Sequence, residues 1–205
     1  MRVFAQMNSW STYYAAVANQ PPSVLIQQAV SRLDRRDSAL DLGSGTMRDS
    51  EYLLNQPVGF RRVQSVDSSP DALPYAELMR AKHGHRFDHA RTPFADFDYG
   101  IDRYDLVHAN FSLPFHGPIG FESLMGRILA SVRISGVFSG VLFGWNDGWR
   151  RLSKPYAFHS RQEVKEMFDG FDVSLQEAQF EGALSDNSRK HWHYFRVIAK
   201  KRDEL

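Results

Sequence analysis

The fold of this chain is decided by the stretch Ser38–Ser50, which reads S-A-L-D-L-G-S-G-T-M-R-D-S. Its first five residues, Ser38–Leu42, predict a short buried strand, and the run 48–54 predicts the helix that follows. The turn between them contains Gly43 and Gly45. Glycine allows positive φ and close approach of a ligand, and the helix after the turn presents free backbone N–H groups. The stretch therefore predicts a βα unit with a ligand-binding turn.

The same alternation of strand and helix continues along the chain. Further strands are predicted at 62–66, 87–90, 104–109 and, after a turn at 134–136, at 137–143, and helices at 10–18, 23–33, 69–82, 121–132 and 160–168. Two long strands, 171–180 and 192–199, are separated by a polar loop at 181–190 and predict an antiparallel hairpin. Because alternating βα units give a parallel sheet with helices on both faces, we expect an α/β, Rossmann-like three-layer sandwich.

Composition excludes several classes of protein. The 205 residues include no cysteine, which excludes disulfides, thiolate metal sites and cysteine nucleophiles. The 25 Lys and Arg nearly balance the 24 Asp and Glu, whereas proteins that track nucleic-acid phosphates are usually basic. No apolar run is long enough to span a bilayer, and residues 1–20 do not read as a secretory signal. We expect a cytoplasmic protein with no nucleic-acid or membrane partner, present as a monomer or homodimer.

The length favours one domain, which we divide into an N-terminal helical lid at 1–36 and a Rossmann-like core at 37–205. The last four residues, Arg202–Leu205, resemble an endoplasmic-reticulum retention tag. Such tags act only on chains that enter that compartment, so we interpret these residues as a coincidental charged tail.

Asp67 ends the second predicted strand, about 20 residues past the glycines, where an acidic side chain can accept hydrogen bonds from ribose hydroxyls. Asp67 could alternatively cap the following helix. Ser69 is better placed for that role, because Pro70 comes directly after it and proline is favoured at the first position of a helix. The dinucleotide fingerprint has a glycine at its sixth position, where this chain has Arg48. The residues thus disfavour NAD and FAD, whereas Asp41, before the first glycine, suits a cofactor with an amino-acid ammonium group.

These residues resemble the acid-x-Gly-x-Gly-x-Gly pattern of class I S-adenosylmethionine-dependent methyltransferases, with Met47 in place of the third glycine. The run Gly43–Ser50 is similar to the G-x-G-x-G-R-D/N-S run of tellurite-resistance-type methyltransferases. Residues 110–115, 142–149 and 191–193 resemble an uncharacterised bacterial subgroup, so the resemblance covers nearly the whole chain. It implies a seven-stranded, mostly parallel sheet with an antiparallel C-terminal strand. It also implies methyl transfer from S-adenosyl-L-methionine to a small-molecule or oxyanion acceptor.

The resemblance also implies contacts to the cofactor. Asp41 would hold the ammonium group, the glycine turn would pass beneath the methionine and ribose, and Asn110 would lie near the methionine part. A residue after the third strand should reach the adenine, with Arg91–Thr92 as first choice and Asp88 as second. The full set of expected cofactor residues is Asp41, Gly43, Ser44, Gly45, Arg48, Asp67, Ser68, Arg91, Thr92 and Asn110.

On the acceptor side, the enzyme must align a nucleophile with a reactive methyl sulfonium, exclude water and sometimes remove a proton. Aromatic and polar residues after the fourth and fifth strands, together with the lid, are candidates for the pocket: Phe111, Phe115, His116, Phe143, Trp149, Trp10, Tyr13 and Tyr14. The alternative for each aromatic side chain is packing.

The candidate catalytic residues are Asp147, His191 and His193. The last strand is antiparallel, so its start should lie at the edge where the parallel strands end, beside Asp147. A neutral histidine there could take a proton near pH 7, although the histidines could instead cap the hairpin. No metal is expected, because a third ligand could come only from His159 or Asp147.

Two other functions stay open on the sequence. One is a non-catalytic S-adenosylmethionine-binding module, which Met47 in the glycine turn would favour. The other, less favoured, is a nicotinamide-dependent oxidoreductase.

Overall fold

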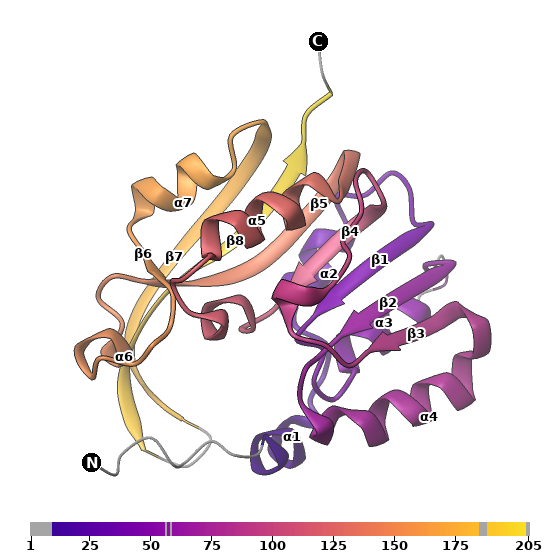
Figure 1. Ribbon diagram of the computed structural model, residues 1–205, viewed down its shortest axis with the longest axis horizontal. Helices are drawn as coiled ribbons and strands as arrows, with labels where there is room; N and C mark the ends of the chain where they lie inside the picture. The colour runs from indigo at the N-terminus through magenta and orange to yellow at the C-terminus, as the bar shows by residue number, and fades with distance from the viewer. Residues whose placement is uncertain (1–9, 56, 58, 185–187, 204–205) are drawn as a thin grey trace.

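A computed structural model describes residues 10–55, 57, 59–184 and 188–203. Its strands form one sheet in the order β3-β2-β1-β4-β5-β8-β7, with β6 beside β5 (Figure 1). Neighbours among β1–β5 are parallel, and β8 is antiparallel to both β5 and β7. The strands are β1 (Ser38–Leu42), β2 (Arg62–Val66), β3 (Phe87–Ala90), β4 (Tyr104–Ala109), β5 (Val132–Gly144), β6 (Phe158–His159), β7 (Phe171–Ala183) and β8 (Arg189–Lys201).

The expected sandwich is confirmed, with one difference in the sheet. The described sheet has eight strands rather than seven, because the short β6 pairs in parallel with the end of β5. The predicted hairpin is β7 and β8, and both strands are longer than expected. The middle of its connecting loop, 185–187, lies outside the described residues, as do residues 1–9 of the expected lid and the last two residues of the charged tail.

Helices cover both faces of the sheet. Buried side chains of α2, α3 and α4 pack on one face and those of α5 and α7 on the other. Figure 1 shows α5 in front of the sheet, α2 and α3 behind it, and α1 below β1–β3. The helices are α1 (Ser11–Val17), α2 (Val24–Val30), α3 (Arg48–Asn55), α4 (Leu73–His83), α5 (Phe121–Ala130), α6 (Gly148–Arg151) and α7 (Arg161–Met167). Within the described residues, no helix has the length and apolar character needed to cross a membrane.

Local signals set most of the element boundaries. The hydroxyl of Ser23 accepts from the Ile26 N–H and starts α2, and Ser160 with Glu163 forms the predicted capping box of α7. The turn expected at 134–136 is instead part of β5. The strand is irregular there: Ser135 adopts φ 61°, and the pairing with β4 shifts register. An irregularity of this kind bends a strand without ending it.

Candidate active site

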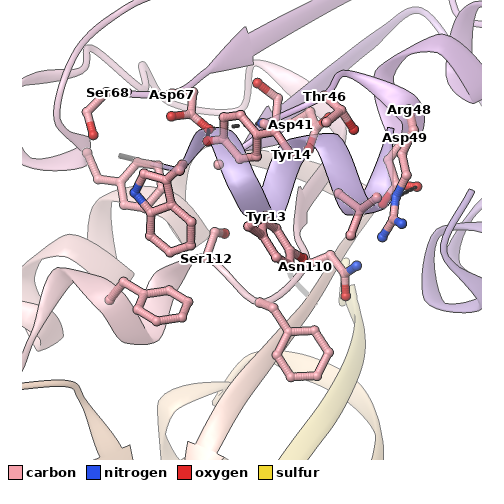
Figure 2. A pocket seen from close by; sticks show the side chains of 18 of the residues that line it. Tyr13, Tyr14, Asp41, Thr46, Arg48, Asp49, Asp67, Ser68, Asn110 and Ser112 are labelled. Carbon is pink, nitrogen blue, oxygen red and sulfur yellow. Dashed lines mark hydrogen bonds and ion pairs between the residues drawn. The ribbon is translucent and has the colours of Figure 1, made fainter. Parts of the chain in front are cut away.

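A cavity of about 410 Å³ lies where β1, β2, β3 and β4 end, with α1 on its far side. This is the edge at which parallel α/β sheets place their ligands. Figure 2 shows Asp41, Asp49 and Asp67 along one side of it, Asn110 and Ser112 along the other, and Tyr13 between them. The residues that line it are Trp10, Tyr13, Tyr14, Val17, Asp41, Gly43, Ser44, Gly45, Thr46, Arg48, Asp49, Asp67, Ser68, Pro93, Phe94, Asn110, Phe111, Ser112, Phe115 and His116.

The glycine turn forms the floor of this cavity, and both glycines have positive φ, 70° at Gly43 and 50° at Gly45. A Cβ on Gly43 would lie 2.2 Å from the Cβ of Ser112, and one on Gly45 would lie 3.0 Å from the ring of Tyr14. Gly43 is therefore required by packing against the chain itself. Gly45 is required by the approach of α1.

Met47 occupies the position where the methyltransferase pattern has its third glycine, and it adopts φ 62°. The backbone thus keeps the conformation that favours glycine, at a cost of about 1–2 kcal/mol for an L-residue. The Met47 side chain is buried in the core beneath the turn. Because it points into the core, the substitution leaves the path of the turn unchanged.

Asp67 is the buried carboxylate at the end of β2. Its Oδ2 accepts from the Gly45 N–H at 2.9 Å and from the Tyr14 hydroxyl at 3.2 Å, and its Oδ1 accepts from the Ser69 N–H at 2.9 Å. Ser69 is the helix cap, as expected, because its hydroxyl accepts from the Asp71 N–H. Asp67 thereby joins the glycine turn, the start of the next helix and the α1 segment at one point.

Asp41 is buried at the end of β1, and its Oδ2 accepts from the Ser50 hydroxyl at 2.7 Å. Burial, reinforced by the carboxylates of Asp49 and Asp67, raises the pKa of Asp41 to about 6 despite the nearby His108 and Ser50. A cationic partner stabilises a buried carboxyl group with a raised pKa, because a nearby positive charge favours its ionised form. The position therefore suits an ammonium group.

The sequence analysis missed Asp49, which lines the cavity beside Asp41. Its Oδ2 lies 3.0 Å from Nε2 of the fully buried His108, whose Nδ1 lies 2.7 Å from the Ser139 hydroxyl. Its Oδ1 accepts from the Ser23 N–H at 2.7 Å. Burial acts to raise the pKa of Asp49, but the hydrogen bonds from His108 and Ser23 and the charges of His108 and Arg48 together outweigh it, so the pKa lies below its usual value. Asp49 follows Arg48 in α3 and is the D/N position of the run Gly43–Ser50 described above, which was the signal that could have singled it out.

Ser44 has a buried hydroxyl in the cavity lining, and within the described residues this oxygen has no hydrogen-bond partner. Buried polar atoms normally have a partner, so an unpartnered one facing a cavity indicates a place for a ligand atom. Arg48 also lines the cavity, and its guanidinium donates to Gln20 at 3.1 Å and lies 3.8 Å from Asp49.

An aromatic wall, which we define as Trp10, Tyr13, Phe111 and Phe115, closes the cavity on the side of α1 and of the segment after β4. Phe111 adopts φ 52°, a backbone strain of about 1–2 kcal/mol. Its ring is held by Tyr194 and Trp192, at centroid distances of 5.1 and 5.9 Å. Such strain persists only where the surrounding structure enforces it.

Two predicted pocket residues, Phe143 and Trp149, lie behind this wall rather than in the lining. Their ring centroids are 5.7 and 5.9 Å from that of Phe115. They support Phe115, which corrects the expectation that they border the acceptor. Phe111, Phe115, His116 and Tyr14 lie in the lining as expected.

The cavity lining includes neighbours of the residues expected at the adenine rather than those residues themselves. Arg91 and Thr92 do not line the cavity, whereas the next two residues, Pro93 and Phe94, do. The second choice, Asp88, points to Arg80, with an N–O distance of 3.4 Å. The lining lies two residues beyond Arg91–Thr92 because β3 ends at Ala90 and the chain reaches the cavity only at Pro93 and the 3-10 turn that follows, Phe94–Asp96.

The candidate catalytic residues Asp147, His191 and His193 lie outside the cavity lining. The carboxylate of Asp147 is buried and pairs with Lys190, while it also accepts from the Trp149 and His193 N–H groups at 3.0 and 3.1 Å. His193 lies 2.9 Å from Glu177, and His191 lies 2.9 Å from Glu181 on β7. The segments that carry Asp147 and the two histidines do meet at the predicted edge of the sheet. Their side chains, however, form contacts that connect β8 to α6 and β7.

Lys190, which the sequence analysis did not single out, has its ammonium 3.7 Å from the Trp149 ring centroid and 4.0 Å from that of Trp192. Burial acts to lower the pKa of Lys190, against the opposing effect of the Asp147 carboxylate. This corner is therefore a buried ion pair inside an aromatic box. Within the described part of the chain, no group of three or more His, Cys, Asp or Glu side chains is arranged to hold a metal ion.

No protein-family model and no curated protein sequence matches the chain. Solved structures are similar to it in fold. TehB from Haemophilus influenzae superposes with a TM-score of 0.73 at 16% identity, covering 94% of this chain and 67% of that one. The 1,6-didemethyltoxoflavin-N1-methyltransferase from Burkholderia thailandensis, solved with 1,6-didemethyltoxoflavin and S-adenosylhomocysteine, has a TM-score of 0.61 at 23% identity, covering 88% and 79%.

A third similar structure is the [4+2]-cyclase SpnF, with a TM-score of 0.64 at 13% identity, covering 88% of this chain and 80% of that one. At these identities the similarity shows the fold alone. The chain therefore has the Rossmann-like fold of class I methyltransferases. SpnF carries a different activity in its name, so the reaction must be argued from the site.

Proposed function

We propose that the protein is an S-adenosylmethionine-dependent methyltransferase that acts on a small-molecule acceptor. The observation that carries this proposal is the cavity itself. It brings two buried carboxylates, Asp41 and Asp67, to either side of a positive-φ glycine turn that also offers the unpartnered hydroxyl of Ser44. These groups match the charged and hydroxyl-rich parts of the cofactor.

The residues present fit the cofactor part by part. Asp41 would hold the ammonium group, and the Ser44 hydroxyl would donate to a carboxylate or hydroxyl of the ligand. Asp67 would accept from the ribose hydroxyls, as acids at this position do in related folds. Phe94 and Pro93 would border the adenine in place of the residues first expected. Similar structures that are named as methyltransferases support this assignment.

Bound S-adenosylmethionine would supply a methyl group on a positively charged sulfur. The residues of this chain would position the acceptor and exclude water, with Trp10 and Tyr13 of the α1 segment closing the cavity. An aromatic surface there would add cation–π attraction for the sulfonium. His116 lines the cavity, and a neutral imidazole would accept a proton from an acceptor that has to lose one.

The oxidoreductase alternative is disfavoured by two observations. The antiparallel β8 lies between β5 and β7 rather than in a second βαβ half, and Arg48 stands where the dinucleotide turn has its last glycine. The non-catalytic alternative loses its main argument, because Met47 leaves the turn in its glycine-like conformation.

Calorimetry with S-adenosylhomocysteine and with NAD tests the proposal. We expect S-adenosylhomocysteine to bind with micromolar or better affinity and NAD to bind far more weakly. Asp67→Asn and a control at a remote ion pair, Asp34→Asn, separate site binding from general effects. Binding of NAD alone, or of neither ligand, would refute the cofactor assignment. Binding of S-adenosylhomocysteine with no methyl transfer to any acceptor in a metabolite extract would favour the non-catalytic module.

A further inference from the structure

We infer that the acceptor is a flat, uncharged aromatic molecule rather than an oxyanion, an inference that rests on the methyltransferase function proposed above. Two independent features of the cavity carry it. One is the balance of charge in its lining, and the other is the aromatic wall and the way the wall is held.

The charges in the lining oppose an anion. Among the described residues of the lining, three buried carboxylates, those of Asp41, Asp49 and Asp67, face a single arginine. That arginine, Arg48, is already engaged by Gln20 and by Asp49. With Asp41 and Asp67 engaged by the cofactor, an oxyanion would meet the Asp49 carboxylate and find no free guanidinium in the described lining, and like charges in a partly enclosed site repel strongly. Sites that hold oxyanions instead surround them with arginine or backbone N–H groups.

The aromatic wall offers flat surface in place of charge. The Trp10 and Phe115 rings meet edge to face, with centroids 5.3 Å apart and planes at 81°. Phe115 is fixed from behind by Tyr156 at 4.9 Å as well as by Phe143 and Trp149. A ring held on several sides keeps its orientation in the absence of ligand. It therefore presents a ready-made surface on which another ring can stack or pack edge to face.

Phe111 adds a second argument, because its backbone holds a conformation that L-residues rarely adopt. Asparagine or glycine would relieve that strain, yet the position holds a phenylalanine whose ring borders the cavity. An observed outlier of this kind points to a functional requirement. We assign Phe111 and Phe115 as residues that determine which acceptor is bound.

The test uses protein loaded with S-adenosylhomocysteine and three probes: 2-naphthol, its saturated analogue decahydro-2-naphthol, and tellurite. Ligand-observed NMR and calorimetry report binding without any methyl transfer. We expect 2-naphthol to bind about two- to tenfold more tightly than its saturated analogue, which is the range of aromatic pair interactions. We expect tellurite to bind more weakly than either.

Two variants and a control assign the effect to the wall. Phe115→Leu and Phe111→Leu each keep an apolar side chain. Leucine at position 111 has the same unfavourable backbone conformation as phenylalanine, so the substitution does not change the strain. Both should reduce the preference for 2-naphthol more than they reduce affinity for S-adenosylhomocysteine. Phe171→Leu, at the start of β7 on the opposite edge of the sheet, should change neither.

Several outcomes would overturn the inference while leaving the proposed function intact. They are equal binding of the two naphthol analogues, absence of 2-naphthol binding, tighter binding of tellurite, or a loss of S-adenosylhomocysteine affinity in the leucine variants as large as the loss for 2-naphthol. The last result would show that the wall holds the cofactor. Failure of wild-type protein to bind S-adenosylhomocysteine would instead refute the proposed function.

Discussion

The hydroxyl of Tyr14 should compete with the cofactor ribose for Asp67. A carboxylate offers about four acceptor positions, and three on Asp67 are taken, by Gly45, Ser69 and Tyr14. Two ribose hydroxyls need two positions, so one existing donor must leave. The two backbone N–H groups are fixed by the turn and the helix start, whereas Tyr14 belongs to α1 and makes the longest of the three bonds, at 3.2 Å.

The expected result of Tyr14→Phe is a less stable free protein that binds S-adenosylhomocysteine more tightly. A hydrogen bond to a charged group contributes about 1.5–3 kcal/mol, and the 3.2 Å length places this one at or below the lower limit. Because binding no longer has to break it, a gain of about 1 kcal/mol, or roughly fivefold in affinity, is expected. Burial and the Asp67 carboxylate raise the pKa of Tyr14, so the hydroxyl stays a donor throughout the neutral range.

Thermal unfolding without ligand and calorimetry with S-adenosylhomocysteine measure the two effects separately. Tyr75→Phe is the matched control, since its ring lies edge to face with Tyr14 at 6.3 Å but forms no part of the cavity lining. The control should leave affinity unchanged. A loss of affinity in Tyr14→Phe would refute the reasoning, because it would mean that the hydroxyl stays in place and helps to hold the ribose.

Three further predictions follow from the buried charges. Asp67→Asn should weaken S-adenosylhomocysteine binding by about 1.5–3 kcal/mol and also destabilise the free protein, as calorimetry and thermal unfolding would show, since the carboxylate holds Gly45 as well as the ligand. With a pKa of about 6 for Asp41, the affinity for S-adenosylhomocysteine should fall about tenfold from pH 7 to pH 5, and Asp41→Asn should remove this pH dependence. Because the pKa of Asp41 is raised in the folded state, its contribution to the free energy of unfolding without ligand should fall as the pH rises from about 4 to about 6. Asp147→Asn should lower the free energy of unfolding by about 3 kcal/mol, because it leaves the buried Lys190 ammonium without its carboxylate, and a selective loss of turnover with unchanged unfolding would instead restore a catalytic role.

The elements, and the glycine turn and acids that border the candidate site, were predictable because their signals are local. The predicted ranges of β1 to β4 agree with the structure, and the turn at Gly43 follows from a conformation that only a few residues adopt. Asp41 and Asp67 lie at strand ends, and the fold rule that places ligands there needs only their order in the chain. Met47 shows the limit of such patterns, since the positive φ persists without the glycine.

The acceptor half was decided by contacts between residues far apart in sequence. The order of elements correctly brought Asp147 and His193 to one edge, but it could not show that Lys190, 43 residues beyond Asp147, would neutralise that carboxylate. Asp49 is likewise held by a partner, His108, that is 59 residues away in the sequence.

The sequence alone therefore determined the sheet, the glycine turn and the two acids beside it, because strand, helix and turn conformations depend mainly on residues that are close in the sequence. Only the tertiary structure decided which side chains remain available to a ligand. A buried charge or hydroxyl must find a partner, and that partner is chosen by the packing of distant segments. Among the described residues the Ser44 hydroxyl has no such partner, whereas Asp147 and His193 each have one.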